Sequence, residues 1–463
     1  MAMALTQEDF VGDLEITMEA PFAVYPAEPT PRRSMFLSNI DQTLVSTVAT
    51  ITFFPACKQM SFDEIVQRYV DALGKLLVHY DFVAGRLTLN EEDDRLEIDC
   101  NGAGVFFGVG TTDLTLEELK DLKFPNPAFR QLILQDYVSH SHLQDLPLLT
   151  LQATRFKCGG FTVGAGLNHC LFDGISSFDF TVNLASIIRG ESLKVTPDLD
   201  RTILKARVPQ RIDYEHLEYT KFCDIPRGII TAFRGRGGDV EPIESEPIKI
   251  PPRPKLVLKL FPVSVEMLNR LKEKAMEDGK IMKCTSFEVV TAHLWRARSQ
   301  ALEMQSNETS TVLFPVECRS RLEPPISREY AGNAVVPGYA RATVKELRDE
   351  PFSVLVQKVQ QGLSRLGNDY VRSMIDWLEV HKGIPCAVNS FSVVAWWRLG
   401  LEDAEYPWGN PLHLSPAISH CAELVMLLHN PSQQGGGGGG FNVAIALQPH
   451  QFPRFHQLFQ LPK

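Results

Sequence analysis

The sequence predicts a mixed α/β (or α+β) fold in two domains, because helical and strand-like segments alternate along a chain of 463 residues. A chain of this length exceeds one ordinary hydrophobic core, so two domains of about 200 residues each are expected. Residues 197–252 are rich in proline, glycine and charge, which favours a crossover between domains. We therefore expect an N-terminal domain over 1–200, a crossover loop over 201–252 and a C-terminal domain over 253–463.

Two amphipathic helices are the clearest local elements. The first covers residues 61–80, where Ser61 and Glu64 have capping-box spacing and apolar residues then recur at helical intervals. The second covers residues 264–278 and is followed by Gly279, a residue typical of helix ends. Each helix is expected to bury one face.

A third helix is expected to begin at Thr285, because Glu288 follows three residues later in the same capping pattern. Short apolar segments over residues 46–54 and 256–263 are typical of strands. Helices and strands are therefore predicted in both halves of the chain.

The charge balance argues against two classes of partner. The chain carries 46 Lys and Arg against 56 Asp and Glu, which gives a formal net charge of −10 at pH 7. An acidic protein without a basic stripe is a poor binder of nucleic acid and of anionic membrane surfaces. Neither is expected as a partner.

The sequence predicts a cytoplasmic protein without a metal site. No segment approaches the roughly 18 consecutive apolar residues that a membrane span requires, and the N-terminal segment carries acids where a signal peptide needs a basic region. Nine cysteines, an odd number without paired spacing, are typical of reduced thiols. The absence of a CxxC pair disfavours zinc.

The candidate catalytic residue is His169. It directly follows residues 161–168, whose alternating pattern predicts a strand, and it precedes Asp173 and Gly174. A histidine at a strand end is well placed to face a cleft and, with a near-neutral pKa, to move a proton. The bare spacing to an acid is weak, because 12 × 56/463 ≈ 1.5 such matches are expected by chance. A core histidine with satisfied hydrogen bonds therefore remains a fair alternative on the spacing alone.

Other segments extend the pattern and together resemble the BAHD acyltransferase family. Residues 169–174 match its HxxxDG motif, and residues 405–409, EYPWG, resemble its DFGWG motif near the C-terminus. Four further segments fall in family order: LSNIDQ at 37–42, LLVHYDFVAGRL at 76–87, FPVECR at 314–319 and YAGNAV at 330–335. The resemblance thus covers nearly the whole chain.

The resemblance implies two chloramphenicol-acetyltransferase-like domains, each a mixed sheet with helices, with an active-site channel between them. Acyl-CoA would be a co-substrate, no cofactor would stay bound, and the protein would act as a monomer. His169 would deprotonate an acceptor that attacks the thioester in a ternary complex. This chemistry needs only a base and correct positioning, because a thioester is already activated.

The resemblance also assigns structural roles around the histidine. Asp173 would point away from His169 and form an ion pair with Arg319, because a buried carboxylate needs a partner. Gly174 would be structural. The alternative is that Arg319 is a surface arginine without a role in the site.

In the second motif, Trp408 is assigned as a catalytic residue, a possible oxyanion donor, with packing as an equally acceptable alternative. Glu405 and Gly409 are interpreted as structural. Tyr406 keeps the aromatic ring of the motif, whereas Pro407 replaces a glycine and fixes φ there.

Within the family, several segments look closest to hydroxycinnamoyl transferases that act on ω-hydroxy fatty acids and fatty alcohols: FKCGGF at 156–161, DRTILKAR at 200–207, CTSFE at 284–288 and DYVRSMIDWLEV at 369–380. Val394 stands where shikimate-using relatives place a channel threonine, which would make the acceptor pocket more apolar. Trp396 would line the channel or simply pack in the core. Arg398 is either an acceptor-carboxylate anchor or a solvated arginine.

Thr285 and Ser286 are expected near the pantetheine or phosphates of CoA, with a plain helix cap as the alternative. The resulting hypothesis is an O-acyltransferase that moves a hydroxycinnamoyl group from CoA to a long-chain alcohol. Two alternatives remain open: the same chemistry on shikimate, quinate or an amine, and a non-catalytic relative that assists fatty-acid elongation.

Overall fold

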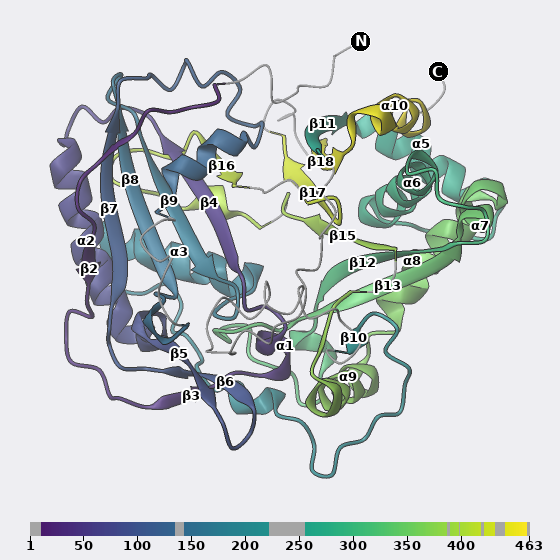
Figure 1. Ribbon diagram of the computed structural model, residues 1–463, viewed down its shortest axis with the longest axis horizontal. Coiled ribbons are helices and arrows are strands. Elements are labelled where there is room, and N and C mark those ends of the chain that lie inside the picture. The colour runs from purple at the N-terminus through teal and green to yellow at the C-terminus, as the bar shows by residue number, and fades with distance from the viewer. Residues whose placement is uncertain are drawn as a thin grey trace, which may run out of the picture.

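The computed structural model describes residues 11–134, 143–221, 255–386, 389–397, 399–417, 421–430 and 440–460. Two large sheets, each covered by helices, lie side by side (Figure 1). This arrangement confirms the predicted α/β architecture. No helix within the described residues is long and apolar enough to cross a membrane.

The first sheet has the strand order β1, β7, β8, β9, β4, β16, and β2 also pairs with β7. Its strands are β1 (Thr17–Met18), β2 (Phe22–Val24), β4 (Thr47–Phe54), β7 (Val105–Thr112), β8 (Leu149–Phe156), β9 (Phe161–Asn168) and β16 (His413–Pro416). Strands β7 and β8 are parallel, whereas β8, β9 and β4 run antiparallel to one another. Strand β9 therefore lies in the middle of the sheet and carries its C-terminal end to the site described below.

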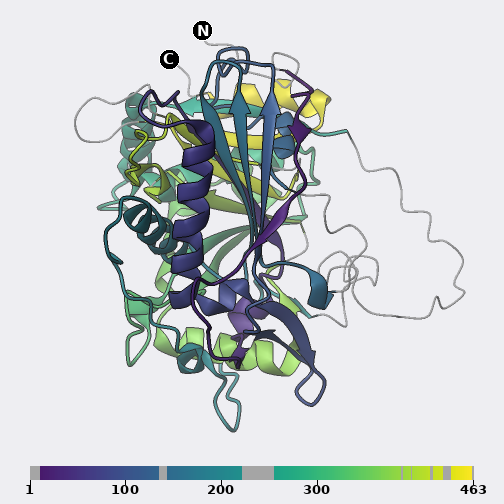
Figure 2. The ribbon, with the colours of Figure 1, turned by 90° about the vertical axis from the view of Figure 1, so that its left-hand side faces the viewer.

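Helices α2 (Phe62–His79) and α3 (Gly174–Ile188) cover one face of this sheet, and Figure 2 shows α2 in front of the strands. The predicted capping box is present at the start of α2, where Ser61 and Glu64 satisfy each other's backbone N–H groups. A short helix α1 (Asn39–Gln42) and a small sheet complete this half of the molecule. The small sheet contains β3 (Ser34–Phe36), β6 (Arg95–Asp99) and β5 (Arg86–Asn90).

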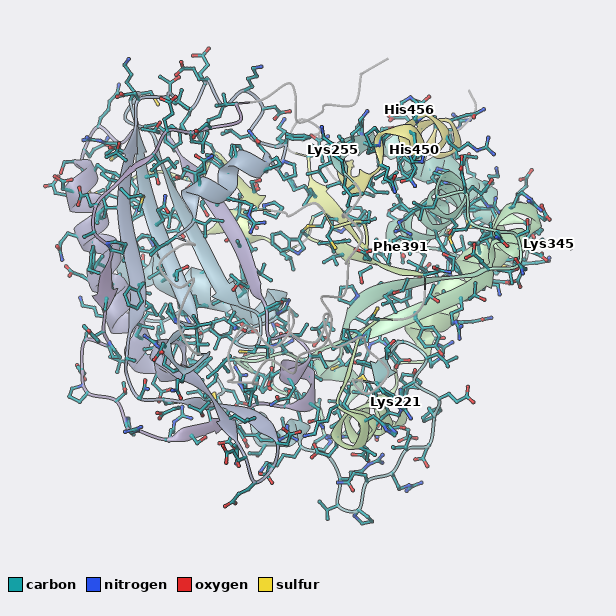
Figure 3. All side chains as sticks on the ribbon, in the orientation of Figure 1. Lys221, Lys255, Lys345, Phe391, His450 and His456 are labelled. Atoms are coloured by element: carbon teal, nitrogen blue, oxygen red, sulfur yellow. The ribbon has the colours of Figure 1, made fainter. Side chains whose placement is uncertain are left out.

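The second sheet has the order β11, β18, β17, β15, β12, β13. Its strands are β11 (Val257–Val263), β12 (Thr309–Glu317), β13 (Val335–Thr343), β15 (Ser390–Ala395), β17 (Leu424–His429) and β18 (Phe441–Leu447). Helices on this side are α5 (Val265–Met276), α6 (Ser286–Ala301), α7 (Val344–Asp349), α8 (Phe352–Ser364) and α10 (Phe452–Phe459). Phe391 on β15 is buried in this second core, whereas Lys345 lies on its outer edge (Figure 3).

The two halves exchange chain segments. Strand β16 comes from the C-terminal half but pairs with β4 of the first sheet. In the predicted crossover loop, β10 (Thr220–Lys221) pairs with β14 (Gly383–Ile384), which follows α9 (Asn368–His381). The division at 201–252 stays a prediction, because residues 222–254 lie outside the described residues. The structure does place one part of the predicted C-terminal domain, strand β16, in the first sheet.

The other local predictions are confirmed. The second and third predicted helices are α5 and α6, with Gly279 at a positive φ of 72° after α5 and a Thr285–Glu288 capping box at α6. The predicted strands correspond to β4, β9 and β11. Of the six consecutive glycines at 435–440, which the sequence predicts to form a surface connector, Gly440 alone falls within the described residues.

Candidate active site

His169 is held by its backbone at the end of β9. Its N–H donates to the Ser46 carbonyl at 2.8 Å, and its carbonyl accepts from Asn333 Nδ2 at 2.8 Å. The side chain is half-buried, and its Nδ1 is buried without a hydrogen-bond partner among the described residues. An imidazole fixed through its main chain, with ring nitrogens uncommitted to the protein, is free to bind a substrate hydroxyl.

The predicted Asp173–Arg319 ion pair is present and buried. Two guanidinium nitrogens of Arg319 lie 2.8 and 3.1 Å from the two carboxylate oxygens of Asp173. Asp173 also caps α3 by accepting the N–H groups of Ile175 and Ser176, and it accepts from Ala334 N at 2.9 Å. Burial opposes ionisation, but Arg319 and these N–H groups leave the pKa of Asp173 below its usual value. The carboxylate therefore holds residues 169–174 (the histidine loop) in place and is not available to act with His169.

A second buried ion pair supports the same loop. Arg201 Nη1 lies 3.2 Å from Asp41 Oδ2, and both side chains are almost fully buried. Arg201 also donates to the carbonyls of Cys170 and Leu171, directly after the histidine. Both ends of residues 169–174 are thus tied to buried arginines.

Asn333 connects this ion pair to the histidine, because its Nδ2 donates both to Asp41 and to the His169 carbonyl. The sequence reasoning assigned no role to Asp41, Arg201 or Asn333. All three occur in segments used for the family resemblance, at 37–42, 200–207 and 330–335. Asn333 stands among small and apolar residues in its segment, which was an available signal, whereas Asp41 and Arg201 stand in segments with several polar residues.

A cavity extends from His169 between the first sheet and α3. Its floor is formed by β8, β9 and β4 in register: Leu149, Leu167 and Val48, then Leu151, Ala165 and Thr50, then Val163 and Thr52. Its opposite wall is one face of α3 and the segment after β15: Ser177, Phe180, Thr181, Leu184, Trp396, Leu399 and Leu401. Leu414 on β16 pairs with Thr52 and extends the floor. His169, Asp173 and Gly174 lie at one end, and Tyr69 and Tyr406 also line it. The lining is therefore mostly apolar.

Among the described residues that line the cavity, none is a lysine, arginine or glutamate. Asp173 is the lone acidic group in that lining, and it is bound to Arg319. The cavity offers a base, hydroxyl groups and apolar surface. It offers no charged anchor for a substrate carboxylate.

Trp408 lies behind this cavity rather than in its lining. Its ring stacks on those of Tyr406 and Tyr69, with ring centroids 5.3 and 6.4 Å apart. Its Nε1 is buried without an acceptor among the described residues. Phe54 and Phe161 complete the aromatic cluster. This placement favours the packing alternative for Trp408.

The rest of the second motif has a structural geometry. Gly409 adopts a φ of 112°, a backbone conformation that favours glycine. Pro407 is exposed in a turn, and the Glu405 side chain is exposed while its carbonyl accepts from Arg189 at 2.5 Å. Gly174 leaves room for Leu399, since a Cβ there would lie 2.7 Å from that side chain. The Pro407 replacement is therefore accommodated at the surface of the turn.

The other predicted substrate-binding residues differ in whether they line the cavity. Trp396 lines the cavity, as proposed for a channel residue. Val394 on β15 does not line it. Thr285 is the exposed N-cap of α6 and Ser286 its half-buried first residue, and neither lines the cavity. Arg398 lies outside the described residues.

Comparisons with known proteins agree with this picture. The model described as the Transferase family matches residues 14–461. The chain is 38% identical over 457 residues to the acyltransferase GLAUCE of Arabidopsis thaliana, covering 97% of this chain and 96% of that protein. It is 31% identical over 449 residues to the omega-hydroxypalmitate O-feruloyl transferase of the same plant, covering 96% and 93%. It is also 31% identical over 418 residues to its fatty alcohol:caffeoyl-CoA acyltransferase, covering 90% and 92%.

Solved structures share the fold. Vinorine synthase matches with a TM-score of 0.69 at 19% identity, covering 95% of this chain and 96% of that one. TRI101 of F. sporotrichioides, solved with coenzyme A and T-2, matches with a TM-score of 0.67 at 18% identity, covering 92% and 97%. Since the family match spans almost the whole sequence, the chain belongs to the Transferase family of acyl-CoA-dependent BAHD acyltransferases.

Proposed function

We propose that this protein transfers a hydroxycinnamoyl group from coenzyme A to the hydroxyl of a long apolar alcohol, with His169 as general base. The observation that carries the proposal is the position of His169 at the end of a cavity whose lining is apolar. An alcohol is a weak nucleophile until a base takes its proton, and a half-buried imidazole supplies that base.

The reaction uses few protein groups. The imidazole accepts the hydroxyl proton as the oxygen attacks the thioester carbonyl carbon. The tetrahedral intermediate then expels the CoA thiolate, which takes the proton from the imidazolium. Asp173 and Arg319 hold the histidine loop, and the residues of the aromatic cluster pack the cavity wall.

The acceptor class follows from the lining. Shikimate and quinate carry carboxylates, and burying an unpaired carboxylate is costly. No cationic side chain among the described lining residues could pair with one beside His169. A fatty alcohol has no carboxylate, and an ω-hydroxy acid carries its carboxylate at the end of the chain opposite the reacting hydroxyl. Both gain free energy by burying the apolar chain. Relatives at 31% identity named for omega-hydroxypalmitate feruloylation and for caffeoyl transfer to fatty alcohols support the same donor and acceptor classes.

The proposal also covers the CoA site, the cellular location and the oligomeric state. Thr285 and Ser286, at the N-terminus of α6, would hold CoA through a hydroxyl and backbone N–H groups. The acidic composition and the scattered cysteines support a cytoplasmic enzyme. We expect it to act as a monomer.

The test is thiol release from feruloyl-, caffeoyl- and p-coumaroyl-CoA with a panel of acceptors. Wild type should release CoA with long-chain alcohols, and His169→Ala should lose this activity by at least about 10²-fold. The matched control is His450→Ala, which changes an exposed histidine that follows β18 and does not line the cavity. Equal release by wild type and His169→Ala with every acceptor would instead support the non-catalytic relative. A preference for shikimate, quinate or an amine would overturn the acceptor assignment.

A further inference from the structure

The lining of the cavity beside His169 follows strand β9, and this part of the cavity is called the slot below. Val163, Ala165, Leu167 and His169 alternate along β9, so they share one face of the sheet. These side chains line the cavity one after another, with their partners on β4 and β8 beside them. The slot therefore begins at the base and runs along the strand toward Phe161.

The strand sets the length of the slot. Six residues separate His169 from Val163, which at about 3.3 Å per residue gives about 20 Å. An extended polypeptide advances about 3.5 Å over three bonds, so this length corresponds to roughly 16 or 17 bonds of an extended chain. A phenylpropanoid side chain is much shorter. The slot matches a long-chain substrate.

Two tyrosines line the slot away from His169: Tyr406 lies beside its far end, and Tyr69 packs on Trp408 and Phe107. Phe54 and Phe161 form the next cross-strand pair beyond Val163, and Phe54 contacts the Tyr406 ring at 5.1 Å. Tyr69 and Tyr406 both line the cavity, and among the described residues neither hydroxyl forms a hydrogen bond. Burial raises the pKa of both phenols, so each stays protonated and able to donate.

Tyr406 also departs from the family motif. It stands at the aromatic position of DFGWG, where the motif has phenylalanine, so this chain carries an additional hydroxyl. The ring packs on Trp408 whether or not that hydroxyl is present. Packing therefore does not account for the hydroxyl, and a polar ligand group would.

We propose that the slot binds the extended chain of the acceptor alcohol, with its reacting hydroxyl at His169 and an oxygen function at its other end bonded to Tyr69 and Tyr406. The acceptor class is then a chain of about 16 bonds with oxygen at both ends, such as an ω-hydroxy acid or an α,ω-diol. This inference rests on the proposed function, and it adds the binding mode and the residues that select the terminal group.

The first test compares acceptors of different length and different terminus in the full-length enzyme. Wild-type kcat/KM should rise with chain length up to about 16 bonds and fall beyond it. At that length a terminal hydroxyl or carboxyl should be preferred to a terminal methyl. A kcat/KM that is independent of length, or a preference for the methyl terminus, overturns the proposal.

The second test removes one hydroxyl at a time. A hydrogen bond contributes about 1 kcal/mol, so Tyr406→Phe and Tyr69→Phe should each lower the preference for the oxygen-ended chain about fivefold. The change should appear in the acceptor KM. Tyr25→Phe, at a tyrosine 61% exposed on the surface, is the matched control and should leave the preference unchanged. A change in the KM for acyl-CoA instead would place the acyl group in the slot and overturn the proposal.

The third test shortens the slot. Ala165 lies four residues from His169, so Ala165→Phe should block the slot at about 13 Å. The ratio of kcat/KM for long over short alcohols should fall at least tenfold, and an unchanged ratio overturns the proposal. Absence of thiol release from wild type with every alcohol would refute the proposed function itself. Release without any length dependence would refute the slot alone.

Discussion

The Asp173 carboxylate joins the histidine loop to the other half of the molecule by binding Arg319 through both of its oxygens. The same carboxylate caps α3, the helix that forms one wall of the cavity. The position of His169 therefore depends on a contact between segments 146 residues apart in sequence. This is the structural reason for an acid four residues after the base.

Breaking this pair should destabilise the fold strongly. Arg319→Ala leaves a buried carboxylate without its partner, and Asp173→Ala leaves a buried guanidinium, so each should cost about 3–5 kcal/mol in free energy of unfolding. The double variant should lose less than the sum of the two. Urea denaturation followed by circular dichroism measures all three.

The control for that experiment is a solvated ion pair, Arg348 with Asp349, whose side chains are both 49% exposed. Removing Arg348 leaves a carboxylate in water, so Arg348→Ala should cost no more than about 1 kcal/mol. Additive effects of Asp173→Ala and Arg319→Ala, or costs as small as that of Arg348→Ala, would contradict the assigned role.

Asn333 should affect the rate more than substrate binding. Its amide holds the His169 carbonyl, and Asn333→Ala removes that bond together with the one to Asp41. A displaced base lowers kcat, and we expect a loss of at least tenfold with little change in either KM. Asn183→Ala, at a buried amide of α3 that binds the backbone of Lys194 and Val195 instead, should cost stability without this loss of kcat. Equal kcat values for the two variants would contradict a positioning role.

The sequence predicted the local elements well because capping boxes and strand alternation are read from neighbouring residues. Ser61 with Glu64 and Thr285 with Glu288 marked the starts of α2 and α6. Strand β16 was missed as part of the first sheet, since its pairing with β4 joins segments far apart in sequence. Periodicity within a segment contains no information about such a partner.

The candidate site was likewise predicted only in part. His169 and the Asp173–Arg319 pair followed from ordered motifs and are found together. The cavity was not predictable, because its lining comes from four strands, two helices and the segment after β15. Whether Val394 or Trp396 faces it depends on how that segment turns, and the structure selects Trp396.

Trp408→Phe tests whether the indole donates to the oxyanion. The ring packs between Tyr69 and Tyr406 and does not line the cavity, so we expect kcat to change by less than about threefold, far below the roughly 10²-fold loss of an oxyanion donor. The free energy of unfolding should fall by about 1–2 kcal/mol from lost packing. Steady-state kinetics and urea denaturation separate the two roles, and a large drop in kcat at unchanged stability would restore the catalytic assignment.

Acid should weaken the second half of the molecule through His293. This residue of α6 is buried, and its Nε2 donates to the Phe459 carbonyl at 2.7 Å, which ties α10 to α6. Burial lowers its pKa from 6.5 to about 4, so the folded protein keeps it neutral while the unfolded chain protonates below about pH 6.5. The free energy of unfolding should therefore fall by up to about 3 kcal/mol as the pH drops from 6.5 to 4.

The variant His293→Gln isolates this effect from carboxylates that titrate in the same range. It should be less stable than wild type at pH 7, because it loses packing, and the difference should shrink toward pH 4 as the wild type loses its advantage. His450→Gln, at an exposed histidine, should follow the wild-type curve throughout. Urea denaturation at intervals between pH 7 and 4 measures the three curves, and parallel curves for His293→Gln and wild type would show that His293 already titrates near its unfolded pKa.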